Sequence, residues 1–172
     1  MHTIPEKIIS GGQTGADQAG LESAKMFDIP TGGFAPYRFI TTAGEAPFLG
    51  EKYGLVETTF GYKDRTKLNI EESDCTIIIV SDMYSPGTRL AVRHLKELKK
   101  PYVLVCYNPK CDLLDWTLQP DLKKAIDMLD SFGYNKPILN VAGNSEKTCP
   151  FSYRYSMFFM YNLLEIITAK YV

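Results

Sequence analysis

The stretch from Ile8 to Ala24 reads IISGGQTGADQAGLESA and decides the fold. Its β-branched opening is stopped by a pair of glycines, which is typical of a buried strand that ends in a turn. Beyond the loop, apolar residues recur at helical spacing from Ala19 onward, and Asp17 or Thr14 is placed to cap the first turn. The stretch therefore predicts a strand, a glycine loop and a helix in succession.

The same succession recurs downstream. The run Cys75–Val80 (CTIIIV) is continuously apolar, as expected of a parallel strand covered by helices on both faces. Alternating strands and helices predict a parallel sheet with right-handed crossovers, so we expect one open, doubly wound α/β domain over residues 1–172. The predicted strands are Lys7–Ser10, Thr31–Pro36, Cys75–Val80, Tyr102–Tyr107 and Ile138–Val141, and the predicted helices start near Asp17, Leu90 and Pro120.

Two segments fall outside this alternation. Tyr37–Lys63 is rich in Gly and Pro without a clear period, so we expect it to be mostly irregular, and its aromatic residues suggest a lid over a ligand. Phe151–Tyr171 carries a dense apolar cluster with interior polar residues, which predicts a packed helix rather than a membrane span. That helix either completes the core or is buried against a second subunit.

Composition narrows the class of function. The 172 residues are 45% hydrophobic and 23% charged, which is typical of a globular protein. With 19 basic against 20 acidic residues, the net charge of −1 disfavours nucleic-acid binding. Two histidines and four cysteines without CxxC spacing predict no protein-ligated metal and reduced thiols. No apolar leader opens the chain, so we expect a cytoplasmic protein.

Three loops at expected strand ends carry residues suited to an anionic small molecule. In Ser10–Asp17 (SGGQTGAD), glycines let backbone N–H groups approach a phosphate at a helix N-terminus. Ser85–Arg89 (SPGTR) repeats this arrangement, and we expect it to follow a neighbouring strand. Asn140–Ser145 (NVAGNS) offers neutral donors and acceptors for a heterocycle or ribose. Tight turns are the alternative explanation for the glycines, and they explain the asparagines equally well; for a lone arginine a surface ion pair is the favoured explanation.

Several motifs together resemble the molybdenum carrier family, which belongs to the Rossmann-like nucleotide-binding proteins that include the lysine-decarboxylase-like proteins. The resemblance rests on IISGGQTGADQAGLESA, GGFAP, DRTKLNIEESDCTIII, SPGTRLA, KPYVLV and ILNVAGNS, in order over nearly the whole chain. It implies a Rossmann-like fold, a homo-oligomer (dimer or tetramer), and a bound molybdenum cofactor or nucleotide held through its phosphate.

The resemblance also implies site residues. Gly11, Gly12, Gln13, Thr14 and Gly15 would form the anion cradle, with Asp17 capping the helix. Relatives carry a more basic segment after GGFAP, so that Arg38 is the main candidate contact left there. They also have two glycines before the threonine, where this chain has Ser85, Pro86 and Gly87. The remaining candidate binding residues are Arg65, Thr66, Asn69, Gly87, Thr88, Arg89, Asn140, Gly143 and Asn144.

Three hypotheses follow from these observations. The first is a protein that binds, carries or sequesters a phosphate-bearing small molecule. The alternative is a hydrolase of a nucleotide phosphate or N-glycosidic bond in the same pocket, for which Asp17, Asp82 and Glu57 are candidate acids. The third is an oligomeric scaffold with a vestigial site.

Overall fold

A five-stranded parallel sheet forms the centre of the computed structural model, which describes residues 1–59 and 61–169. The strands lie in the order β2-β1-β9-β7-β8, and every pairing between them is parallel. The predicted parallel sheet is therefore confirmed. The strand bounds are β1 Lys7–Ile9, β2 Thr31–Gly32, β7 Cys75–Val80, β8 Tyr102–Cys106 and β9 Ile138–Gly143.

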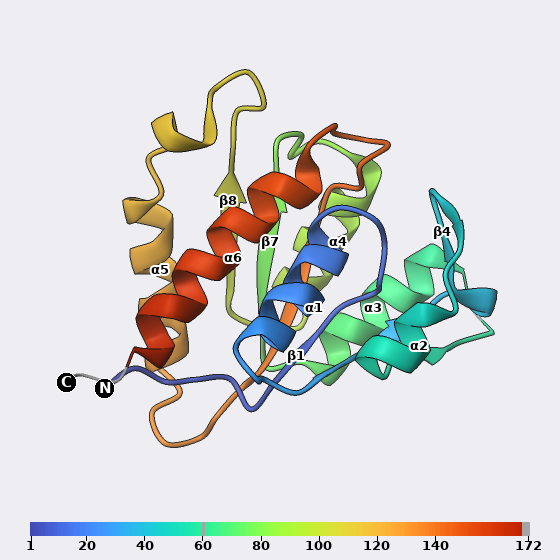
Figure 1. The fold of residues 1–172 in the computed structure, drawn as a ribbon. Helices are drawn as coiled ribbons and strands as arrows, with labels where there is room; N and C mark the ends of the chain where they lie inside the picture. The colour runs from blue at the N-terminus through green and yellow to red at the C-terminus, as the bar shows by residue number, and fades with distance from the viewer. Residues whose placement is uncertain (60, 170–172) are drawn as a thin grey trace.

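Helices cover both faces of this sheet, as Figure 1 shows. One face carries α1 (Ala16–Met26), α5 (Gln119–Asp130) and α6 (Ser152–Thr168), and the other carries α3 (Tyr62–Glu72) and α4 (Pro86–Glu97). Side chains of β7 alternate between the two cores: Ile77 and Ile79 pack toward α6, whereas Ile78 and Val80 pack toward α4. The continuously apolar run thus has the cause that the sequence predicted.

The last strand of the sequence lies in the middle of the sheet. β9 pairs with β1 on one side and β7 on the other. Counting β9 as the first strand turns the order into 3-2-1-4-5, the arrangement of a Rossmann fold whose first strand has moved to the end of the chain. The expectation that the first two loops follow neighbouring strands is therefore wrong, because β9 lies between β1 and β7.

The segment expected to be irregular contains short elements instead. They are η1 (Tyr37–Phe39), β4 (Ile40–Thr41), β5 (Gly44–Glu45), α2 (Phe48–Tyr53) and β6 (Val56–Glu57). Leu49, Tyr53 and Leu55 bury their side chains against Leu21 and Ala35 in a small core of their own. Elements of two to six residues are too short to show a period, which is why the sequence did not reveal them.

The predicted strand Thr31–Pro36 is two strands in different sheets. β2 joins the central sheet, whereas β3 (Phe34–Ala35) pairs with β6. Between them Gly33 has φ +120°, and a Cβ there would lie 2.1 Å from the carbonyl oxygen of Ser10. This close approach requires glycine at the point where the chain leaves the sheet.

Helix α6 completes the core on its side of the sheet. Its side chains Phe159, Met160 and Leu163 are fully buried, whereas Tyr161 and Ile166 are partly exposed, so the helix is not buried on all sides. The predicted range continues to Tyr171, which lies outside the described residues. No helix in the described part of the chain is long and apolar enough to cross a membrane.

Candidate functional site

A cavity of about 610 Å³ lies at the carboxyl ends of β7 and β9. The chain leaves β7 toward α4 on one face and leaves β9 toward α6 on the other, so the loops diverge and open a crevice. Open α/β sheets bind ligands at such a topological switch point. The predicted residues that line the cavity are Gly11, Gln13, Arg65, Thr66, Asn69, Ser85, Gly87, Thr88, Asn140, Gly143 and Asn144.

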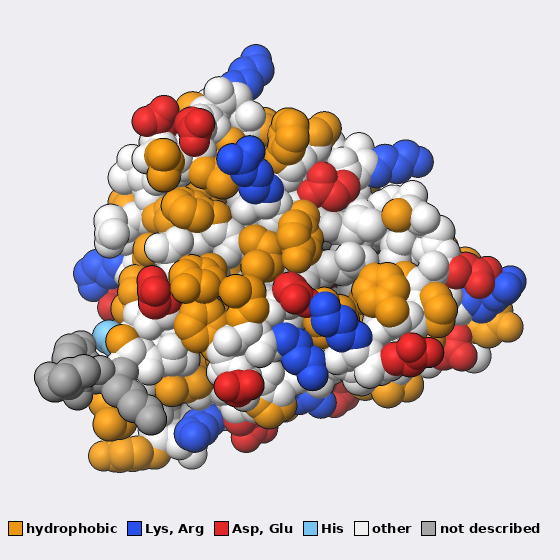
Figure 2. All heavy atoms as spheres, in the orientation of Figure 1, with side chains coloured by type: hydrophobic (Ala, Val, Ile, Leu, Met, Phe, Trp, Pro, Cys, Tyr) orange, Lys and Arg blue, Asp and Glu red, His pale blue; other side chains and the backbone are white. Residues whose placement is uncertain are grey.

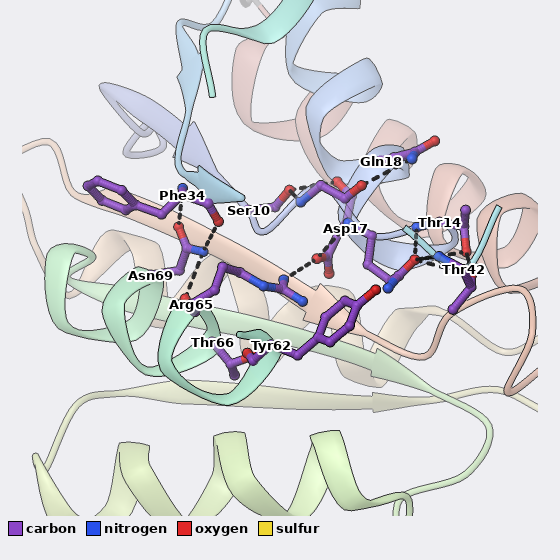
Figure 3. A network of polar contacts seen from close by, with 12 residues as sticks. Ser10, Thr14, Asp17, Gln18, Phe34, Thr42, Tyr62, Arg65, Thr66 and Asn69 are labelled. Atoms are coloured by element: carbon purple, nitrogen blue, oxygen red, sulfur yellow. Dashed lines mark hydrogen bonds and ion pairs between the residues drawn. The ribbon is translucent and has the colours of Figure 1, made fainter. Parts of the chain in front are cut away.

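A buried ion pair forms one wall. Arg65 Nη1 on α3 lies 3.0 Å from Asp17 Oδ2 on α1, with 9% and 7% of the two side chains exposed (Figure 3). Gly11 packs against the guanidinium so closely that a Cβ would fall 1.4 Å from Nη1. On another side, the Arg65 guanidinium carbon lies 5.8 Å from the centre of the Tyr62 ring.

Arg65 has donor capacity that the protein does not use. Its Nε is buried and has no hydrogen-bond partner among the described residues. A buried donor without an acceptor costs about 1–3 kcal/mol, so native structures rarely leave one without a reason. Arg65, which lines the cavity, therefore keeps one donor without an acceptor in the described residues.

The glycine loop holds an anion that belongs to the protein itself. The Gln13 N–H donates to Asp17 Oδ2 at 3.1 Å, and the Gly12 N–H donates to Ser10 Oγ at 3.2 Å. The Thr14 N–H donates to the side-chain carbonyl of Gln13 at 2.9 Å. Three N–H groups of the predicted cradle therefore already have acceptors within the protein.

Asp17 also does not cap helix α1. Gly15 occupies the N-cap position without a side-chain cap, and Asp17 lies inside the first turn with its carboxylate directed back to the loop and to Arg65. Burial raises the pKa of Asp17 above its ordinary value of 3.8, while the Arg65 guanidinium and the Gln13 N–H oppose the rise.

Three further residues of the predicted cradle lie outside the cavity lining. A Cβ on Gly12 would collide with Leu49 and Leu55, and a Cβ on Gly15 would lie 2.4 Å from the carbonyl oxygen of Asn144. These two glycines allow close backbone packing. Thr14 Oγ1 contacts Thr42 Oγ1 at 2.7 Å, which joins the loop to the β4–β5 hairpin.

The second loop supplies the opposite wall. Ser85 caps α4, because its Oγ accepts from the Thr88 N–H at 3.4 Å and contacts Thr88 Oγ1 at 2.9 Å. No acceptor in the described residues takes the Gly87 N–H, and a Cβ on Gly87 would meet nothing within 4 Å. The helix N-terminus therefore opens on the cavity.

The side chains of the three predicted asparagines form hydrogen bonds with other parts of the protein. Asn144 Oδ1 accepts from the N–H groups of Ser81 and Asp82, at 2.9 and 3.0 Å, so it holds the β7 and β9 loops together. The Asn69 side chain accepts from the N–H of Phe34 and donates to its carbonyl, both at 2.9 Å (Figure 3). Asn140 Nδ2 donates to Thr76 Oγ1 at 3.3 Å.

Thr66 lines the cavity, whereas two of the predicted arginines, Arg38 and Arg89, do not. Thr66 Oγ1 donates to its own helix, at the carbonyl of Tyr62, 2.9 Å away. Arg38 lies outside the cavity lining, in η1, and its Nη2 pairs with Glu45 of the β4–β5 hairpin at 2.8 Å. Arg89 lines a separate groove beside α4 and β8. The structure does not bring either arginine into the cavity.

The cavity also contains residues that sequence reasoning missed. Lys147 and Thr148 follow the third loop, and Thr41, Thr42 and Tyr62 come from the hairpin and α3. Lys147 lies two residues beyond the predicted loop range, so a wider window would have found it. The others carry no sequence signal, because only the tertiary fold brings them to the site.

Of the three candidate catalytic acids, only Asp17 lines the cavity. Glu57 is exposed and accepts from the Arg38 N–H at 2.7 Å, and neither Glu57 nor Asp82 lines the cavity. Only Asp17 does, and it is engaged by Arg65. Among residues 1–59 and 61–169, no group of three or more His, Cys, Asp or Glu is placed to hold a metal ion.

Comparison with known proteins identifies the family of the chain and a solved structure that it resembles. Residues 8–164 match the profile of the circularly permutated YpsA SLOG family. A crystal structure of a "putative molybdenum carrier protein" from Syntrophus aciditrophicus is 31% identical, covers 98% of both chains and superposes with a TM-score of 0.80. No curated protein matches the chain.

Proposed function

Because the chain belongs to the circularly permutated YpsA SLOG family, we propose that it binds and carries or sequesters a phosphate-bearing small molecule in the cavity between β7 and β9. The ligand class is the molybdenum cofactor or a nucleotide-derived compound. The name of the Syntrophus relative supports a carried ligand. The permuted strand order agrees with the family description.

One observation carries this proposal: Arg65 lines the cavity, and its buried Nε has no hydrogen-bond partner in the described residues. A guanidinium suits phosphate because its planar donors match two phosphate oxygens. Lys147 adds a second cation, with no ion pair recorded in the described residues. Together with the Asp17 carboxylate, the charged lining groups carry a net charge of +1, which favours an anion.

The arrangement of donors supports a place for the phosphate. The Gly87 N–H and the positive end of the α4 dipole face the cavity from the β7 side. Lys147 and Thr148 face it from the β9 side. We place the anionic group between these loops and Arg65, at the crevice where Rossmann folds hold phosphate.

Binding is better supported than hydrolysis. General acid or base catalysis needs a titratable group within reach of the reacting atom. Asp17 is the carboxylate that lines the cavity, and its Oδ2 already accepts from Gln13 and Arg65. We therefore assign Asp17 to the architecture of the site.

Assembly and location remain proposals of the same kind. We propose a cytoplasmic homo-oligomer, with contact through the face that α1 and α6 present. Figure 2 shows hydrophobic side chains gathered over this face, where Met26, Tyr161 and Ile166 are exposed. Native mass spectrometry would report the number of subunits and any retained ligand together.

The test is an equilibrium titration with molybdenum cofactor, purine mononucleotides and ADP-ribose. We expect saturable binding of at least one compound, and a loss of about tenfold or more in Arg65→Ala, equal to about 1.4 kcal/mol for a charge-assisted hydrogen bond. Arg93→Ala is the matched control, because Arg93 lies 70% exposed on α4 outside the cavity. Binding of none of the compounds would remove the proposal.

A further inference from the structure

The glycine loop and the cavity meet at a single oxygen atom. Asp17 Oδ2 accepts both the Gln13 N–H, at 3.1 Å, and Arg65 Nη1, at 3.0 Å. The loop therefore binds a carboxylate of its own chain where a phosphate-binding loop would bind its ligand. Through that carboxylate, the loop fixes the position of the guanidinium.

Three contacts restrict the guanidinium. Asp17 holds Nη1, the bare Cα of Gly11 lets the group lie against the loop, and Tyr62 lies on another side. Because Nη1 is engaged, the edge formed by Nε and the second Nη is the part left for another acceptor. Nε is buried and without a partner in the described residues, and this edge has the two parallel donors that carboxylates and phosphates accept.

We infer that Asp17 is a positioning residue, which orients Arg65 so that its Nε edge binds the anionic group of the ligand. The glycine loop then acts on the ligand through Arg65, and not through its own N–H groups. The inference rests on the proposed function, because it identifies Arg65 as the group that binds the phosphate of the proposed ligand.

Nuclear magnetic resonance of protein labelled with ¹⁵N-arginine tests it directly. The Arg65 Nε–H signal is assigned by its disappearance in Arg65→Lys. Inorganic phosphate and AMP are the two probes, and we expect saturating addition of either to shift this signal. Arg93 serves as the internal reference, because its exposed side chain lies outside the cavity and its signal should stay in place.

A double-mutant cycle separates positioning from a general structural role. Asp17→Asn keeps an oxygen for one donor but removes the charge, and we expect about tenfold weaker binding of AMP. Arg65→Lys should weaken binding by a similar factor. If Asp17 acts through Arg65, the double variant binds no more weakly than Arg65→Lys alone. Independent, multiplying losses would overturn the inference.

The outcomes distinguish the inference from the proposed function. AMP or phosphate that binds without moving the Arg65 signal leaves the binding function standing and removes the role of Arg65 and Asp17. Failure of every titrated compound to bind removes both. Should Asp17→Asn fail to fold, the Arg65 signal of the unaltered protein still decides the question.

Discussion

Gly11 and Arg65 are in direct contact: a Cβ on Gly11 would fall 1.4 Å from Nη1 and 2.3 Å from the central carbon of the guanidinium. The contact joins the loop after β1 to a helix more than fifty residues later in the chain. Arg65 can reach Asp17 only because position 11 has no side chain.

We therefore expect Gly11→Ala to displace Arg65 from Asp17. Ligand affinity should fall about tenfold or more, and the free energy of unfolding by about 1–3 kcal/mol, because a buried carboxylate loses a charged partner. Isothermal titration and chemical denaturation measure the two effects. Gly61→Ala is the control, since a Cβ there meets nothing within 4 Å. An unchanged affinity in Gly11→Ala would contradict the arrangement.

Lys100 should stabilise the end of α3. Its Nζ donates to the carbonyl oxygens of Ile70 and Ser73 at 2.9 and 2.6 Å, and also to that of Glu71. Lys100→Met removes the charged donor from these carbonyl oxygens. We therefore expect the free energy of unfolding, measured by urea denaturation, to fall by about 1–3 kcal/mol. Lys96→Met, on exposed α4, should change stability by less than about 0.5 kcal/mol. Equal effects would mean that Lys100 does not cap the helix.

Stability at acid pH should depend on Glu22. Hydrogen bonds from Lys52 and Tyr53 lower the pKa of Glu22 below its ordinary value of 4.5. Its contribution is thus present above pH 4.5 and is lost as the pH falls through the lower, folded-state pKa. Glu22→Gln should lose less stability than the unaltered protein between pH 6 and pH 3, by up to about 1 kcal/mol. Parallel curves of unfolding free energy against pH would refute this.

The β4–β5 hairpin should loosen in Gln13→Ala. The Gln13 side-chain carbonyl accepts the Thr42 N–H at 2.8 Å, and this bond ties the exposed hairpin to the glycine loop. Hydrogen–deuterium exchange should increase within residues 38–45, with the melting temperature nearly unchanged. Gln18→Ala should leave the hairpin protected, because Gln18 bonds to Gly12 and not to the hairpin. Exchange that is the same in both variants would exclude the tie.

The sequence predicted the sheet and its helices because long apolar runs report burial directly. Helix α3 was not predicted, since its buried face contains Arg65 and Asn69 beside Ile70 and so shows no apolar period. The position of β9 was also beyond reach, because parallel pairing is set by contacts between distant strands. The sequence therefore predicted which strands end near the site, but not which strands lie next to each other in the sheet.

The same limit explains the errors at the site. A glycine loop before a helix indicates a bound anion. The sequence alone does not tell whether that anion is a ligand or a carboxylate of the protein itself. Asp17 lies in the same motif, and its carboxylate accepts the N–H of Gln13 from the loop. Lys147 and Thr42 enter the cavity from segments with no motif of their own. The placement of Arg65 beside the cavity, by contrast, agrees with the expectation from the family resemblance.

The position of β9 has a consequence for synthesis on the ribosome. Translation reaches the middle of the sheet only after β1 and β7 have been made, so these two strands have no common neighbour until residues 138–143 emerge. Until then the inner edges of β1 and β7 lack the strand that joins them in the folded sheet. We therefore expect a chain that stops before Ile138 to expose the edges of β1 and β7 and to aggregate.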